Sequence, residues 1–215
     1  MAFDLLTMTL RLPALAVALT FHEFAHAWVA DRLGDPTPRR LGRLTLEPWA
    51  HLDPIGTLLI VFYGFGWAKP VPTNPYYYSG DPRKGLLKVA FAGPLANLAL
   101  AFILAVLMVL DFRWHLLGAI PYLGRLIAIT FQLNVLLAVF NLLPLPPLDG
   151  YRVLASLLPA HQAYRLERLE QVGPLLLLVV LVSGVATGLV VGLSRVVMRL
   201  LWAVAEILGR VFPPF

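Results

Sequence analysis

Long apolar runs separated by short polar connectors most restrict the fold of this 215-residue sequence. Hydrophobic residues make up 59% of the chain, charged residues only 13%, and the mean hydropathy is +0.78. A helix needs about 20 apolar residues to cross a bilayer, so this length allows roughly four to six spans and no sizeable soluble domain beside them. The apolar runs along the chain predict about five to six transmembrane helices. The pattern predicts an all-α polytopic membrane protein with a single membrane-embedded domain over residues 1–215.

Most of the apolar runs have the length of a full span. The expected spans cover residues 12–30, 86–110, 119–143 and 173–193. Between the first and second of them, residues 54–67 are apolar but short, β-branched and aromatic, and interrupted by glycine. That composition predicts a small membrane-associated β-hairpin or a re-entrant segment.

The last segment, residues 194–212, has its charged residues on one helical face. This pattern favours a helix lying on the membrane surface, and the alternative is a further span with a polar stripe. The charged residues of that face are Arg195, Arg199, Glu206 and Arg210.

Basic residues concentrate in three connectors. Residues 31–53, 67–88 and 151–172 carry four, four and three Lys or Arg residues, against one in residues 111–118. Because cytoplasmic loops are enriched in Lys and Arg, all three are expected on the cytoplasmic side, which requires residues 54–67 not to cross the membrane. No single basic stripe is present, so nucleic acid is not an expected partner.

The stretch FHEFAHAW, residues 21–28, places three ionisable side chains inside the first apolar run. His22 and His26 are four residues apart, so on a helix both imidazoles can reach one metal ion. Glu23 is close enough to take a proton from an attacking water without being a ligand. The pattern H-E-x-x-H is typical of zinc-assisted peptide hydrolysis. The alternative is a pair of packing histidines, but ionisable groups within a span are costly and usually functional.

A hydrolytic zinc with two His ligands needs a third protein ligand, and the absence of cysteine restricts it to His or a carboxylate. Asp149 directly follows the fourth apolar run, in the proline-rich stretch NLLPLPPLDGY. Irregular backbone at membrane depth occurs only inside protein or beside a water-filled cavity, so Asp149 is the preferred candidate. The alternative is an Asp that caps the following helix. His26 and Asp149 can meet only if residues 54–67 do not cross the membrane.

Together these residues resemble the site-2 protease family of intramembrane zinc metalloproteases. The resemblance is carried by HEFAH (22–26), GPLAN (93–97) and N-x-x-P-x-P-P-L-D-G (141–150), in the order that the family has them. The chain is similar to the compact branch, which lacks PDZ and CBS domains. It departs from the family at Tyr151, where many members have a second glycine. The resemblance places a catalytic core at about residues 12–160, followed by C-terminal helices at 173–212.

The resemblance implies one Zn²⁺ held by His22, His26 and Asp149, with Glu23 as the general base. It also makes Asn141 and Asn97 candidates for contacting the substrate carbonyl or the oxyanion. From the residues alone, Asn97 belongs equally to a stripe of small residues (Gly93, Asn97, Ala101, Ala105) that would let two helices pack closely.

The implied activity is hydrolysis of a peptide bond within or near the transmembrane segment of a single-span membrane protein, such as a membrane-anchored regulator. A metal-ion transporter would be expected to carry polar ligands in several spans, and an inactive membrane scaffold would not need Glu23. The lack of cysteine, organelle signals and accessory domains predicts the plasma membrane of a prokaryote, with the active site opening toward the cytoplasm.

Overall fold

The computed structural model describes residues 5–63, 66–115 and 120–211, and every regular element within them is helical. This confirms the all-α expectation. The longer helices are α1 (Leu5–Arg32), α3 (Pro54–Tyr63), α4 (Pro82–Trp114), α5 (Leu123–Asn141), α6 (Asp149–Leu157), α7 (Ala160–Glu170), α8 (Gly173–Val182) and α9 (Val185–Val211). The short helix α2 (Thr37–Arg40) and two 3₁₀ turns, Pro48–Ala50 and Pro75–Tyr77, lie in the connectors.

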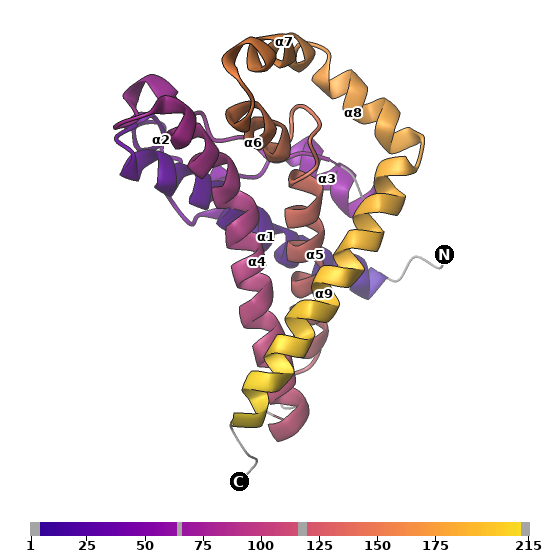
Figure 1. Cartoon of the computed structure of the whole chain (residues 1–215). Coiled ribbons are helices and arrows are strands. Elements are labelled where there is room, and N and C mark those ends of the chain that lie inside the picture. The colour runs from indigo at the N-terminus through magenta and orange to yellow at the C-terminus, as the bar shows by residue number, and fades with distance from the viewer. Residues whose placement is uncertain (1–4, 64–65, 116–119, 212–215) are drawn as a thin grey trace.

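The bundle is built around α4, which packs against α1, α5 and α9. In Figure 1, α4, α5 and α9 run together toward the end marked C, and α6, α7 and α8 form an arch at their other end. The expected stripe of small residues on α4 is buried along its whole length. Its Gly93 and Asn97 end faces α1, whose buried positions include Ala14, Ala18, Ala27 and Ala30, whereas Ala101 and Ala105 pack in a core cluster with residues of α5 and α9. Small side chains on both helices let the two backbones approach closely.

Four helices among the described residues are long and apolar enough to cross a membrane: α1, α4, α5 and α9. The prediction of five to six spans is not confirmed, because the run 173–193 is not one helix. It breaks at Gly184, whose φ of 76° lies in the left-handed region. Helix α8 has 10 residues and is therefore about 15 Å long, half the thickness of the hydrocarbon core.

The β-hairpin predicted for residues 54–67 is wrong over residues 54–63, which form helix α3; residues 64 and 65 lie outside the described residues. The helix begins in an ordinary way. The Asp53 carboxylate accepts a hydrogen bond from the Gly56 amide at 2.8 Å, and Pro54 is the first helical residue. At 10 residues, α3 is too short to cross a bilayer, as the distribution of basic residues requires. Three apolar side chains of this helix are exposed, Ile55, Leu58 and Phe62.

Residues 194–211 continue the helix that begins at Val185, and α9 packs along α4 and α5 with Ala205 fully buried. The charged residues of the last segment are all exposed, so the predicted polar face is confirmed. The length and hydropathy of α9 favour the alternative of a span with a polar stripe over a helix lying on the surface.

The break at Gly184 generates a stability prediction. Replacing Gly184 with Ala should lower the free energy of unfolding by about 1–2 kcal/mol, because an L-residue with a Cβ is strained at positive φ. Thermal unfolding in detergent measures the change. Gly188→Ala is the matched control, since Gly188 is helical and an added Cβ there meets open space. Equal effects of the two substitutions would contradict a structural role for the break.

Candidate active site

Three side chains predicted as ligands converge on one point inside the bundle. His22 and His26 project from the same face of α1, and Asp149 is the first residue of α6. The two imidazole Nε2 atoms are 3.1 Å apart, and Asp149 Oδ2 lies 3.1 Å from Nε2 of His22 and 3.2 Å from Nε2 of His26. All three residues are buried. The structure therefore brings the predicted ligand set together across 123 residues of sequence, counted from His26 to Asp149.

Both imidazoles are held through their other ring nitrogen. His22 Nδ1 lies 2.6 Å from Asn97 Oδ1, and His26 Nδ1 lies 2.7 Å from the carbonyl oxygen of Val89. The Asn97 amide donates to the carbonyl of Ala18, so its oxygen is the atom that faces His22. Both Nδ1 atoms thus donate, and in the neutral rings both Nε2 atoms present bare lone pairs.

Two lone pairs and a carboxylate oxygen at about 3 Å repel one another unless a cation lies between them. Asp149 Oδ2 is buried and receives no well-aligned hydrogen bond, although it lies close to both imidazoles. A tetrahedral zinc with bonds of about 2.0–2.1 Å holds its ligand atoms roughly 3.3 Å apart, close to the separations observed. The donor set and its spacing therefore fit a zinc ion.

The turn between α5 and α6 positions Asp149 in the cluster. Helix α5 ends at Asn141, and the prolines of the following stretch prevent a regular helix until α6 begins. The residue at the N-cap of α6 is Leu148, and no side chain caps the helix. The Asp149 carboxylate therefore does not cap α6, and the alternative role predicted for it is wrong. Tyr151, where the resemblance expected glycine, is buried and its hydroxyl donates to the Leu166 carbonyl of α7.

Helix α4 approaches the cluster at a residue without a side chain. A Cβ built on Gly93 would lie 2.6 Å from Cε1 and 2.7 Å from Nε2 of His22, and it would also overlap Nε2 of His26. No real Cβ contact is that short, so the metal-binding faces of both rings occupy the space that any other residue would fill. This explains the glycine of the GPLAN motif by close approach.

Glu23 lies beside the cluster and is also buried. Its Oε2 accepts a hydrogen bond of 3.1 Å from the backbone amide of Val71, in the connector between α3 and α4. Two buried residues of the preceding connector, Arg43 and His51, also interact electrostatically with Glu23. Burial lowers the pKa of Arg43 and of His51 from their ordinary values, and the Glu23 carboxylate opposes both shifts.

The two asparagine candidates have different surroundings. Asn97 is fully buried, and its amide donates to Ala18 and to Asn134 while its oxygen faces His22. Contact with an oxyanion would require Asn97 to give up one of these bonds. Asn141 donates only to the Leu137 carbonyl one turn earlier in α5, and its substrate role stays a prediction.

Several residues of the site were missed by the sequence analysis. Asn134 of α5 is fully buried and receives the second bond of Asn97, which extends the support of His22 to a third helix. A polar residue inside an expected span was the available signal for it. Arg43 and Val71 lie in connectors and carried no comparable signal, since Arg43 was counted only as a cytoplasmic charge.

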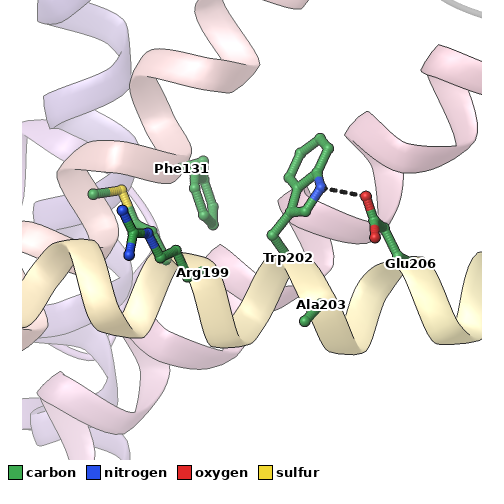
Figure 2. A pocket seen from close by; sticks show the side chains of 6 residues that line it. Phe131, Arg199, Trp202, Ala203 and Glu206 are labelled. Atoms are coloured by element: carbon green, nitrogen blue, oxygen red, sulfur yellow. Dashed lines mark hydrogen bonds between the residues drawn. The ribbon is translucent and has the colours of Figure 1, made fainter.

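A surface hollow elsewhere in the bundle is separate from the metal cluster. A hollow of about 320 Å³ between α5 and α9, shown in Figure 2, contains none of the clustered residues. Phe131 and Arg199 line one part of it, and the Trp202 indole donates to Glu206 at 2.7 Å in the other. The His–His–Asp cluster is instead buried inside the bundle, and this cluster is the candidate hydrolytic site.

Membrane-length helices that enclose a His–His–Asp cluster, with a glutamate beside the first histidine, define a membrane-embedded metallohydrolase. Comparison with known proteins leads to the particular family. The profile of peptidase family M50 matches residues 118–184, which include Asp149. The chain belongs to peptidase family M50, the site-2 protease family, and is a multi-pass membrane zinc metalloprotease.

The relatives support this assignment over most of the chain. The Bacillus subtilis protein named "Putative zinc metalloprotease YwhC" is 45% identical over 172 residues, which cover 79% of this chain and 78% of the relative. "Putative zinc metalloprotease MJ0611" of Methanocaldococcus jannaschii is 33% identical over 71% of this chain and 72% of the relative. "Putative zinc metalloprotease Rip2" of Mycolicibacterium smegmatis is 33% identical over 78% and 64%. No solved structure matches this chain.

The close approach of Gly93 generates a prediction about the metal. Gly93→Ala should weaken zinc binding by about 10–100-fold, the usual cost of disturbing the surroundings of metal ligands, because the new methyl overlaps both imidazoles. Zinc content after dialysis against graded chelator measures this. Gly124→Ala, where an added Cβ meets open space, should keep its zinc. Full zinc retention by Gly93→Ala would contradict the packing described above.

Proposed function

We propose that this chain is an intramembrane endopeptidase that hydrolyses a peptide bond within or near the transmembrane segment of a single-span membrane protein. The observation that carries the proposal is the place of the His–His–Asp cluster: it is buried inside the bundle, and both histidines lie on α1, a helix of membrane length. A water-soluble protease has no need to bury its hydrolytic residues among lipid-facing helices. The substrate class we infer is that of membrane-anchored regulators.

We assign the binding of one zinc ion to His22, His26 and Asp149. Zinc, when bound, would polarise the scissile carbonyl and acidify the attacking water. The protein holds the three ligand atoms in place through Asn97, the Val89 carbonyl and the backbone turn before α6. These partners fix which ring nitrogen faces the ion, so the site is organised before a substrate arrives.

Glu23 is the general base in this proposal. Its carboxylate lies next in sequence to the first ligand, and one of its oxygens is already held by the Val71 amide. It takes a proton from the attacking water and later delivers it to the amine of the leaving peptide. Transfer at this position is efficient because the carboxylate is fixed and largely shielded from bulk water.

The substrate has to unwind before it is cut. Carbonyl groups of a helical transmembrane segment are hydrogen-bonded to amides four residues later, and Glu23 and the three ligands are each at most 8% exposed. An intact helix cannot bring a carbonyl to such a closed cluster. Cleavage therefore requires a locally extended substrate segment and a displacement of the backbone around Val71, whose amide is bonded to Glu23.

We place the protein in the plasma membrane of a prokaryote, with the site opening toward the cytoplasm. The charge of the three basic connectors and the short length of α3 support this orientation. Exposed aromatic side chains in the connectors that face the same side, among them Trp49, Trp67 and Tyr76, suit a membrane interface. The bilayer and a single-span protein are then the expected partners, and nucleic acid is not.

The proposed activity is tested with a single-span reporter in detergent. Wild-type protein should cleave the reporter, and Glu23→Gln should lower kcat by about 10²–10⁴-fold while retaining zinc, because only the proton transfer is lost. Gel analysis of cleavage and metal analysis of both proteins are the two measurements. Equal cleavage by the two proteins would remove Glu23 from the mechanism.

The orientation is tested separately. The chain has no cysteine, so Ser79→Cys and Phe112→Cys each provide one thiol, near opposite ends of α4. In intact cells, a membrane-impermeant maleimide should label the cysteine at 112 and leave the one at 79 unlabelled until the membrane is opened. The reverse pattern would place the active site on the outer side.

A further inference from the structure

A short extended segment crosses the catalytic glutamate. Residues 69–74 (Lys69, Pro70, Val71, Pro72, Thr73 and Asn74), here called the strap, contain no helix or strand. Pro70 and Pro72 have no backbone N–H, so Val71 supplies the one amide donor of that tripeptide. That single donor is bonded to Glu23 Oε2 at 3.1 Å, and Val71 itself is buried.

Arg43 holds the strap immediately before Val71. Its Nη2 donates to the carbonyl of Lys69 and, at 2.6 Å, to the carbonyl of Pro70. Arg43 is only 5% exposed, and its own amide donates to the Pro38 carbonyl at 2.8 Å. The guanidinium of this buried arginine donates to two consecutive backbone carbonyls, and these two bonds determine where the next peptide unit lies.

The rest of the strap is fixed to the same connectors. The Lys69 amide donates to the His51 carbonyl at 2.8 Å, and the Asn74 amide donates to Asp35 Oδ2 at 2.6 Å. The other oxygen of Asp35 accepts from the Thr37 amide, and Asp35 is fully buried. Because both ends of the strap are held by buried groups, only the orientation of the middle peptide depends on Arg43.

The charge of Arg43 also suits this position. Its Nη1 is buried and has no hydrogen-bond partner, and the Glu23 carboxylate acts on the guanidinium as an opposite charge. A buried guanidinium is stabilised by such a charge, and the carboxylate in turn is held by the amide that the guanidinium positions. The contacts form one chain: Arg43, the carbonyls of Lys69 and Pro70, the Val71 amide, and Glu23.

We propose that Arg43 is a positioning residue for peptide hydrolysis: its guanidinium fixes the strap so that the Val71 amide holds the Glu23 carboxylate in the orientation required of the base. This inference rests on the proposed role of Glu23 as the general base. Arg43 acts through the strap and touches neither substrate nor metal. One oxygen of Glu23 is engaged by Val71, and the other is left for the proton transfer.

The first test measures kcat and KM for cleavage of the single-span reporter. Arg43→Gln should lower kcat on the order of 10–100-fold, since displacement of a catalytic group by about 1 Å costs up to about 10²-fold. The KM and the bound zinc should be unchanged, because neither the ligands nor the surface of the bundle is altered. Arg40→Gln is the matched control, with an exposed arginine of the same connector, and should behave as wild type.

A double-mutant cycle tests whether Arg43 acts through the Val71 amide. Val71→Pro removes the donor, whereas Val71→Ala shortens the side chain and keeps the donor. Val71→Pro should reproduce the kcat loss of Arg43→Gln, and Val71→Ala should retain most of the activity. The double variant with Arg43→Gln and Val71→Pro should be no slower than either single variant, because both remove one interaction. Additive losses would overturn the proposal.

A third measurement does not depend on activity. Val71→Cys introduces the only thiol of the chain at a buried position and keeps the backbone amide. Its labelling by a maleimide should be slow and should accelerate at least about 10-fold with Arg43→Gln but not with Arg40→Gln, since local opening controls access to a buried group. Unchanged labelling would overturn the proposal, whatever the activity.

These readouts separate the two proposals. If zinc-loaded wild type and Glu23→Gln cleave equally, the proposed function fails, even if labelling shows that Arg43 holds the strap. If Glu23→Gln is inactive and Arg43→Gln cleaves like Arg40→Gln, the proposed function stands and the positioning role fails. Loss of zinc or a raised KM in Arg43→Gln would also contradict it, because both would show a general structural role.

Discussion

The hydrogen bonds at the Nδ1 atoms of His22 and His26 are the interactions on which the rest of the site depends. Asn97 and the Val89 carbonyl, both on α4, hold the two rings so that their Nε2 atoms point at Asp149 Oδ2. This arrangement requires α1 and α4 to pack closely, which Gly93 and the alanines of both helices allow. The close packing of α1 and α4 and the orientation of the two imidazoles therefore depend on each other.

Burial gives these interactions their strength and also restricts access. At low dielectric the ligand atoms repel one another unless a cation lies between them, and a buried carboxylate such as that of Glu23 needs hydrogen-bond donors nearby. The strap supplies one donor, and Arg43 supplies a compensating charge. In the proposed function, the same burial means that a substrate helix has to unwind before one of its carbonyls can reach the cluster.

Much of the fold and of the metal cluster could be predicted before the structure, and the failures have identifiable causes. The β-hairpin prediction for residues 54–67 relied on β-branched composition and overlooked Asp53-Pro54, an ordinary helix start. The predicted span 173–193 fails at Gly184, since an apolar run does not reveal a positive φ. Asn97 was assigned equally to packing and to contact with the substrate. It lies in the buried stripe and also holds His22, a role that the sequence did not indicate, and its contact with the substrate stays a prediction.

The sequence alone determined the apolar helices, the two histidines on one helical face and the glutamate beside them, because periodicity and residue chemistry are local properties. It also indicated Asp149 through charge and topology. Only the tertiary structure decided which groups orient the imidazoles, why position 93 must be glycine, and that the Val71 amide bonds to Glu23 while Arg43 holds the residues before it. Those contacts join segments up to 79 residues apart, such as Ala18 and Asn97, and their geometry exists only once the helices have packed.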